Sequence, residues 1–378
     1  MNHQNTYLFR DILEHIEVPV NVEPDKEYVQ IGIRSHGKGL FYKEPVLGKA
    51  LGNKQVFWIQ PNCFILNVVF AWEQAITKTT ENEIGMIGSH RFPMYRPKND
   101  LVDIDYLVYY FLTKRGTDIL KAASPGGAGR NRTLGQERFL KSKITLPPLP
   151  EQQKIAVILS TQDKVIELKE KLLALKQQQK KYLMQQLLMP KNKEKSFKAI
   201  HLSDISCLIN KHVDGQKYNY VSTENISPNL SGKVLFDESS IKISGIGFKV
   251  GDILVGNIRP YLKKVWRANK DGLCSTDVLV FRPVGISSEF LYYLIANDNF
   301  FFNVMTTAKG SKMPRGDKKA IMNAKMLIPE SRIEQNFIVE ILSTADHEID
   351  LLQKSIEVEK QKKKALMQLL LTGKVRVK

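Results

Sequence analysis

The sequence predicts a duplicated α/β (α+β) fold, in which two globular segments are separated by two long α-helices that pair as an antiparallel coiled coil. Three observations predict it: a long segment that occurs twice, the helical periodicity of both copies, and short β-type apolar runs before each copy. The chain has 378 residues, of which 43% are hydrophobic and 25% charged. That length is enough for two or three domains with cores of their own.

The repeat comprises residues 151–188 and 334–371, which align without a gap and are identical at 19 of 38 positions. Neither copy contains Gly or Pro, and the helix-favouring residues Leu, Lys, Gln and Glu dominate both. Ile155, Leu159 and Ile166 belong to an apolar stripe with helical spacing. Prolines before the first copy, and a capping box of Ser331 and Glu334 before the second, mark the two helix starts.

Each predicted helix is about 57 Å long, at about 1.5 Å per residue, and its apolar stripe needs a partner. The other copy offers the same spacing of side chains, so an intramolecular coiled coil is expected. Antiparallel pairing is favoured, because it places the two preceding globular segments at opposite ends of the rod.

These helices divide the chain into four parts. Residues 1–149 and 191–328 are expected to form the globular domains, and residues 150–190 and 329–378 the helices. The globular parts share weak similarity, including an apolar stretch at 106–112 and at 290–295 that suits a short buried helix. Runs such as 251–255 and 278–281 predict a small sheet.

The charge of the chain indicates a polyanionic partner. Lys and Arg number 56 against 39 Asp and Glu, which gives a net charge of +17 and favours nucleic acid. Two basic clusters follow or surround glycines, and each lies immediately before one of the long helices. Such loops suit the approach of a backbone to phosphates. The clusters are Arg130, Arg132, Arg138, Lys141 and Lys143, and then Lys309, Lys312, Arg315, Lys318, Lys319 and Lys325.

Reading a DNA sequence requires side chains that reach base edges. The candidates in the first globular segment are Arg34, Ser35, His36 and Lys38. Those in the second are Asn257, Arg259, Tyr261 and Lys263, which lie in a strand-then-loop context. Arg259-Pro260 fits a structural turn equally well, and Trp72 and Trp266 are expected to be packing residues.

Several function classes lack their sequence signals. The seven histidines are dispersed, and neither a nucleophile elbow of the Gly-x-Ser-x-Gly type nor an Asn-Pro-Pro-aromatic tetrapeptide occurs, so no catalytic or metal-binding residue is assigned. The most apolar run, residues 63–72, is too short to span a bilayer, and no signal layout opens the chain, so a cytoplasmic location is expected. Cys63, Cys207 and Cys274 are expected to be buried thiols.

The order globule, helix, globule, helix resembles the DNA-specificity (S) subunit of type I restriction-modification systems, and the similarity covers essentially the whole chain. Both helices open with a Glu-Gln motif and end with Leu-Met-Gln, and the second globule carries a Gly-Asp-Ile-Leu strand. The first globule departs from this pattern, with Gln-Pro-Asn-Cys-Phe-Ile-Leu at 60–66. The matching residues are 149–155, 183–188, 249–255, 274–277, 333–338 and 366–373.

The resemblance implies two target recognition domains, each of which reads one half of a bipartite site on double-stranded DNA from the major groove. It further implies that the helices set the spacing between the halves and dock two modification subunits. Those subunits bind S-adenosylmethionine and methylate adenine, two translocating nuclease subunits can join through them, and this chain itself holds no cofactor. Half-sites about 34 Å apart, one turn of DNA, would suit two rigidly spaced basic globules. Two other classes stay open: a self-sufficient methyltransferase or nuclease, and a coiled-coil scaffold that binds nucleic acid without sequence preference.

Overall fold

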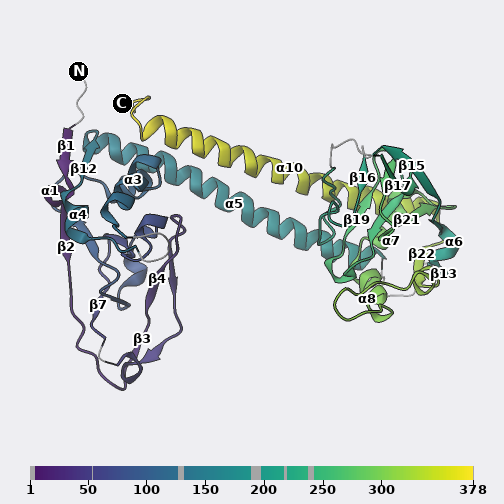
Figure 1. Cartoon of the computed structure of the whole chain (residues 1–378), viewed down its shortest axis with the longest axis horizontal. Coiled ribbons are helices and arrows are strands. Elements are labelled where there is room, and N and C mark those ends of the chain that lie inside the picture. Colours follow the sequence, from purple (N-terminus) through teal and green to yellow (C-terminus); the bar gives the residue numbers. More distant parts are fainter. Residues whose placement is uncertain are drawn as a thin grey trace. The chain divides into compact units, whose positions relative to one another are not determined.

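A computed structural model describes residues 5–52, 54–126, 132–188, 197–216, 219–236 and 242–377. The chain divides into two compact units. Unit 1 consists of residues 1–170 and 355–378, and unit 2 consists of residues 171–354. Each unit therefore contains one globular segment together with parts of both long helices (Figure 1).

The two long helices are α5 (Leu149–Leu188) and α10 (Arg332–Leu370), and they pack together as an antiparallel pair. In unit 1, the amide nitrogen of Gln162 donates to the carboxylate of Glu359 over 2.8 Å. In unit 2, Lys176 pairs with Glu348 over 2.8 Å. Residue numbers rise along α5 as they fall along α10, so the predicted direction of pairing is confirmed.

The globular part of unit 1 is built on a four-stranded sheet in the order β2-β11-β8-β9, with a separate β1-β12 pair beside the start of α5. Three further two-stranded pairs, β10-β7, β3-β6 and β4-β5, complete its strands among the described residues. The strands are β1 (Asn5–Leu8), β2 (Leu13–Ile16), β3 (Glu27–Tyr28), β4 (Ile31–Ile33), β5 (Leu40–Tyr42), β6 (Val46–Leu47), β7 (Val56–Trp58), β8 (Phe64–Leu66), β9 (Ile76–Lys78), β10 (Ile87–Ser89), β11 (Met94–Pro97) and β12 (Lys143–Leu146). The helices are α1 (Phe9–Ile12), α2 (Ile104–Phe111), α3 (Lys114–Ala123) and α4 (Gln136–Lys141), with 3-10 turns η1 (Gly48–Leu51), η2 (Ala71–Glu73) and η3 (Glu81–Glu83).

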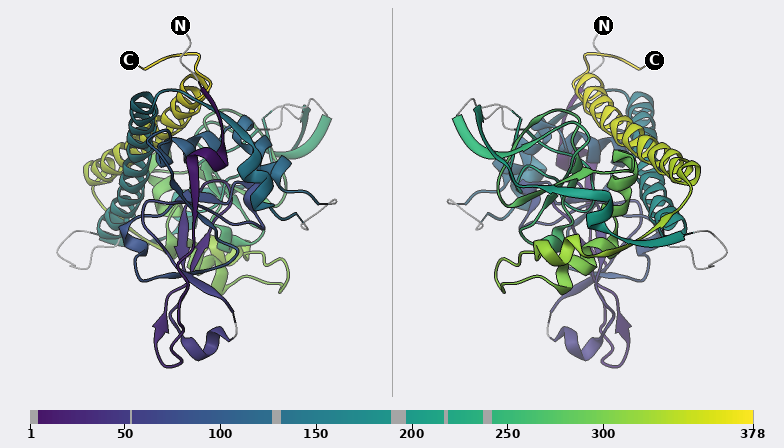
Figure 2. Two further views of the ribbon diagram at one scale, coloured as in Figure 1. Left: turned by 90° about the vertical axis from the view of Figure 1, so that its left-hand side faces the viewer. Right: turned by 90° about the vertical axis from the view of Figure 1, so that its right-hand side faces the viewer.

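The globular part of unit 2 has an equivalent four-stranded sheet, β14-β21-β18-β19, and an equivalent pair, β13-β22. A second four-stranded sheet, β15-β17-β20-β16, shares a buried cluster with the main sheet, to which Val221, Phe248 and Val280 belong. Figure 2 gives two further views of the same ribbon. The strands are β13 (Phe197–His201), β14 (Ser206–Ile209), β15 (His212–Gln216), β16 (Tyr220–Val221), β17 (Lys242–Phe248), β18 (Ile253–Gly256), β19 (Val265–Arg267), β20 (Gly272–Cys274), β21 (Val278–Pro283) and β22 (Lys325–Pro329). The helices are α6 (Leu202–Ile205), α7 (Ser288–Ile295), α8 (Asp298–Thr306) and α9 (Lys318–Met322), with the 3-10 turn η4 (Pro260–Leu262).

Both globules follow one order of elements from the third strand of the main sheet onward. In each, a 3-10 turn joins the sheet's third and fourth strands, three short helices follow, and a strand that pairs with the globule's first strand leads into a long helix. The apolar stretches at 106–112 and 290–295 form α2 and α7, as predicted. The first globule places β8 where the second places β18, although its sequence departs there from the second.

Each globule shares its core with the long helix that follows it. In unit 1, stacked rings of Phe9 and Phe139, 4.8 Å apart, belong to the same cluster as Ile155 and Leu159 of α5. In unit 2, Ile338 and Leu342 of α10 join the cluster around Phe281 and Phe290. Removing these apolar side chains from water, at about 25 cal/mol per Å², holds each globule to its helix.

Among the described residues, no helix is long and apolar enough to cross a membrane. Cys63 and Cys274 are buried as predicted, but Cys207 is exposed, so that prediction is wrong for this residue. Cys207 lies on β14, which is an edge strand, and alternate residues of a strand point to opposite faces. The neighbouring Ser206 takes the buried position.

Candidate nucleic-acid interface

In the second globule, the structure brings the two predicted groups of residues together. The backbone nitrogen of Arg259 donates to the carbonyl of Pro314 over 2.9 Å, and Ile258 and Arg315 form a bridge. Asn257 is buried, and its side-chain oxygen accepts from the backbone nitrogen of Gly316 over 3.1 Å. The loop that contains η4 and the loop before α9 are therefore one continuous surface, which we call the η4 surface (residues 257–263 and 309–318).

The η4 surface carries both paired and unpaired cations. Lys309 pairs with Asp317 over 3.0 Å, Arg315 with Asp277 over 3.0 Å, and Lys263 with Asp298 over 2.6 Å. Three exposed side chains have no acidic partner within the described part of the chain, so no ion pair neutralises their positive charges. They are Arg259, Lys312 and Lys318.

The backbone of the η4 surface is unusual on both sides of the turn. Arg259 and Lys263 have φ angles of 52° and 50°, in the left-handed region that side chains with a Cβ rarely adopt. Such backbone conformations cost free energy and persist only where the surrounding structure imposes them. They are enriched at binding sites. Between them, Tyr261 is 50% exposed and offers a ring face and a hydroxyl to a ligand.

In the first globule, Arg34, Ser35, His36 and Lys38 form the turn between β4 and β5. The turn is fastened to η2, because the Ser35 hydroxyl donates to Glu73 over 3.1 Å and the His36 backbone nitrogen donates to the Glu73 carbonyl over 2.8 Å. His36 has a φ of 62°. Arg34 donates to the carbonyl of Leu40 and lies over the Phe41 ring, and Lys38 is exposed.

The predicted basic loop of the first globule also reaches η2. The guanidinium of Arg132 lies 5.6 Å from the centre of the Trp72 ring, and the backbone nitrogen of Leu134 donates to the Val68 carbonyl over 2.8 Å. Arg130 lies outside the described residues. The structure thus gathers Arg132 and the residue 34–38 turn around η2, a surface we call the η2 surface (residues 34–38, 67–74 and 132–134).

The η2 and η4 surfaces have the same construction. Each contains the turn between the third and fourth strands of the main sheet, and each contacts the segment that precedes α4 or α9. Asn67, which directly follows β8, is buried like Asn257, which directly follows β18. Sequence reasoning missed Asn67, although a signal existed: an Asn directly follows the third strand of the main sheet in both globules.

A duplicated triad, also missed by sequence reasoning, joins each globule to the helix pair. The Tyr109 hydroxyl of α2 donates to Asp163 of α5 over 2.7 Å, and Asp163 pairs with Lys363 of α10, whose ammonium lies over the Tyr109 ring. In unit 2, Tyr293 donates to Asp346 over 2.9 Å, and Asp346 pairs with Lys180. Burial, together with the adjacent aspartate, raises the pKa of Tyr109 and Tyr293, so both phenols stay protonated donors.

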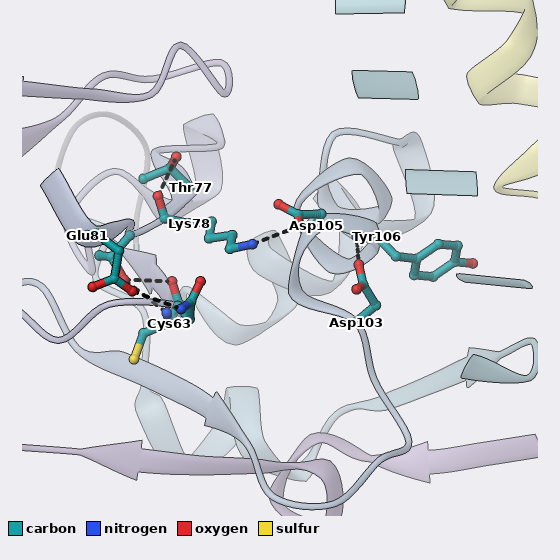
Figure 3. Close-up of polar contacts among 9 residues, drawn as sticks. Cys63, Thr77, Lys78, Glu81, Asp103, Asp105 and Tyr106 are labelled. Atoms are coloured by element: carbon teal, nitrogen blue, oxygen red, sulfur yellow. Dashed lines mark hydrogen bonds and ion pairs between the residues drawn. The ribbon is translucent and has the colours of Figure 1, made fainter. Parts of the chain in front are cut away.

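The Glu-Gln motif at the helix starts has a structural role. The Gln152 amide, fully buried, donates to the carbonyls of Leu101 and Pro147 over 2.8 Å each and accepts from the Asp103 backbone nitrogen over 3.0 Å. Asp103 caps α2, and Lys78 of β9 reaches Asp105 in the same helix over 2.7 Å (Figure 3). The sheet, α2 and the start of α5 are therefore fixed to one another beneath the η2 surface.

The groups on these two surfaces are suited to binding. The surfaces present cations, hydroxyls and ring faces on loops fixed to a rigid sheet, which is how proteins contact phosphates and base edges. Within the described ranges, no group of three or more His, Cys, Asp or Glu residues could hold a metal ion. The fold defines a protein built from two related globular modules, each with a basic loop surface and each joined to the pair of long helices.

Comparison with known proteins identifies the family. The model of the type I restriction modification DNA specificity domain matches residues 22–177 and again 204–360, so the chain belongs to that family. The MjaVIII specificity subunit of a type I restriction enzyme from Methanocaldococcus jannaschii is 27% identical over 312 residues, which cover 74% of this chain and 72% of that protein. The chain is thus a DNA-specificity subunit of the type I restriction-modification class, and neither alternative class is favoured.

Solved structures of the same kind share the fold. The HsdS subunit from Thermoanaerobacter tengcongensis matches with a TM-score of 0.52 at 15% identity, over 99% of this chain and 98% of that one. The S subunit from M. genitalium matches with a TM-score of 0.60 at 13% identity, over 98% and 97% of the two chains. A third match comes from a structure that describes complex assembly and conformational transition of a type I R-M system. Its TM-score is 0.61 at 14% identity, over 98% of each chain.

Proposed function

We propose that each globule reads one half of a bipartite DNA site, through the η2 surface in unit 1 and the η4 surface in unit 2. The observation that carries this proposal is that one loop construction occurs twice, each time with cations that are exposed to a ligand. Two different halves are expected, because the loops differ in sequence while their scaffolds correspond.

Within the η4 surface, Arg259 and Tyr261 are proposed to face bases, and Lys312 and Lys318 to face phosphates. Arg259 stands at the tip of the turn in the left-handed conformation, and a guanidinium can pair with guanine in two places. The lysines lie on the adjoining loop and carry point charges that suit phosphates. Asn257 positions both loops through Gly316 and is proposed to act on DNA only through them.

In the first globule, Arg34, Ser35, His36, Lys38 and Arg132 are proposed to contact DNA around η2. The Ser35 hydroxyl is held by Glu73, so its contribution is proposed to be the position of the turn. Lys38 and His36 are exposed and are proposed to provide the direct contacts.

The helix pair is proposed to set the spacer length and to dock two adenine-methylating modification subunits. Four exposed apolar residues support this docking, because they are repeat partners, Leu168 with Leu351 and Leu175 with Val358. The register of each unit brings Leu168 to the level of Val358 and Leu175 to the level of Leu351. Two equivalent apolar pairs suit two copies of one partner.

The chemistry is proposed to reside in those partners. S-adenosylmethionine would bind the modification subunits and supply the methyl group for adenine, and two restriction subunits would join through them. This chain would supply only the recognition of the DNA sequence and the spacing between the half-sites, and the complex would act in the cytoplasm.

Footprinting of a complex of this chain with its modification subunits tests the proposal. Two short protected blocks are expected, whereas an unspecific scaffold would protect DNA uniformly. Arg259→Ala should weaken protection of one block only, by about 1–3 kcal/mol in binding free energy. The control Lys198→Ala changes an exposed lysine of β13 outside both surfaces and should leave both blocks intact. Equal weakening of both blocks by Arg259→Ala would contradict the division of labour.

A further inference from the structure

Unit 1 contains a cavity of about 290 Å³ that no residue of the η2 surface lines. Its walls come from α2, α3, β12, the start of α5 and the last turn of α10. Gly116 lets α3 approach α2 closely, because a Cβ there would lie 2.4 Å from the carbonyl oxygen of Tyr110. The cavity is therefore a consequence of how four helices and a strand meet around Tyr106 and Tyr110.

Two buried tyrosines line this cavity without a hydrogen-bond partner. Tyr106 is 2% exposed and Tyr110 is 7% exposed, and neither hydroxyl is bonded to any described residue. Their neighbour Tyr109, on the same helix, is bonded to Asp163. Figure 3 shows the Tyr106 ring pointing away from Lys78 and Asp105. Within the described residues no fully buried side-chain oxygen lacks a hydrogen-bond partner, so these two hydroxyls reach the water-accessible space of the cavity, where they are free to donate to a ligand.

The charge at the cavity is positive. Arg115 of α3 and Lys143 of β12 line it, and neither has an acidic partner within the described ranges. Glu151, the carboxylate in the lining, accepts from the guanidinium of Arg376 over 2.7 Å and from the backbone nitrogen of Val377 over 3.2 Å. That carboxylate is therefore neutralised, and two cations remain for a ligand.

The arrangement selects the class of ligand. We propose that this cavity binds a small phosphate-type oxyanion, either inorganic phosphate or a small phosphomonoester, whose oxygens accept from the Tyr106 and Tyr110 hydroxyls and whose charge Arg115 and Lys143 balance. Two positive groups match the two negative charges of such an anion. The volume lies at the lower limit of small-molecule sites, at about 300 Å³. A duplex phosphodiester is disfavoured, because the tyrosines that carry the two hydroxyls are only 2% and 7% exposed.

Binding would also stabilise unit 1. The ligand would bridge α3 and β12 beside the last turn of α10, where residues 370–373 form part of the wall. A ligand that binds only the folded state raises the unfolding temperature in proportion to the logarithm of its concentration over Kd. This inference stands independently of the proposed DNA-reading function.

Titration of the full chain with inorganic phosphate, followed by calorimetry and thermal unfolding, tests the proposal. Saturable binding with one site is expected, together with a rise in unfolding temperature. The double variant Tyr110→Phe/Arg115→Gln should bind phosphate at least tenfold more weakly. Lys114→Gln, which removes the exposed charge next to Arg115 but does not line the cavity, is the matched control and should bind like the parent.

Two further measurements keep the result interpretable. Without phosphate, Tyr110→Phe should unfold at the parent's temperature, since its hydroxyl has no protein partner to lose; a marked decrease would contradict the cavity assignment. A cognate DNA duplex should leave phosphate affinity unchanged, and competition by the duplex would assign these groups to the DNA interface instead. Absence of saturable binding, or equal weakening in Lys114→Gln, would overturn the proposal, while the footprint of the DNA complex would remain an independent result.

Discussion

Lengthening both long helices by the same amount tests whether they set the spacing between half-sites. Four residues are inserted after Leu172 in α5 and four after Lys354 in α10, near the boundary between the two units. Because the helices are antiparallel, the two insertions lie at matching levels. The ion pairs on both sides therefore keep their partners: Lys169–Glu359 and Glu170–Lys360 in unit 1, Lys176–Glu348 and Lys180–Asp346 in unit 2.

The expected change follows from helix geometry. Four residues add about 6 Å at about 1.5 Å per residue. DNA rises about 3.4 Å per base pair, so the tolerated spacer should grow by about two base pairs. The same four residues turn an α-helix about 40° beyond one full turn, whereas two base pairs twist by about 70°. The mismatch of about 30° should weaken binding without restoring the original spacing.

The assay is a map of methylated adenines made by the complex of the variant chain with its modification subunits. Both half-site sequences should be unchanged, and the spacer between them should be longer. An insertion in α5 alone is the control, since it moves one set of ion pairs out of register and should lower the unfolding midpoint. A folded double-insertion variant with the original spacer, or with altered half-site bases, would refute the reasoning.

Three further predictions follow from single contacts. Tyr109→Phe keeps the ring but removes a hydrogen bond to a carboxylate, so urea unfolding should show a loss of about 1–2 kcal/mol, with Tyr182→Phe, an exposed tyrosine, as an unchanged control. Arg376 holds the pKa of Glu151 below its usual range, so this pair stabilises the fold above the carboxyl's ordinary pKa and the effect is lost as pH falls through the lowered pKa. Arg376→Gln should therefore lower stability above about pH 5, and pH-dependent unfolding should show its difference from the parent shrinking as the pH falls below that. Leu168→Asp places a charge on one proposed docking site only, so size-exclusion chromatography with light scattering should show one modification subunit bound instead of two, and two bound would contradict that site.

The helix pair was predictable because its information is local and repeated. Apolar spacing and helix propensity identify each helix, and the repeat identifies its partner. The register was not predictable, because it depends on which charged residues meet across the seam. Asp163 with Lys363 and Asp346 with Lys180 fix it, and the sequence offers many other pairings of lysines with carboxylates.

The candidate interface was predictable only in parts. Sequence reasoning placed Asn257 and Arg315 in separate clusters, since more than fifty residues lie between them. The structure joins the clusters through backbone bonds such as Arg259 to Pro314, which depend on chain path and hardly on side-chain identity. The same holds for η2, where the Glu73 carbonyl holds the residue 34–38 turn.

The triads help to explain why the two long helices resemble each other in sequence more than the two globules do. Each triad takes its tyrosine from one globule, its aspartate from the helix that follows that globule, and its lysine from the other helix. Asp163 and Asp346 are repeat partners, and so are Lys180 and Lys363, so a change in one helix must suit the other copy as well. The globule loops carry no such mutual constraint. The two proposed recognition surfaces can therefore diverge to different DNA sequences while the helices stay alike.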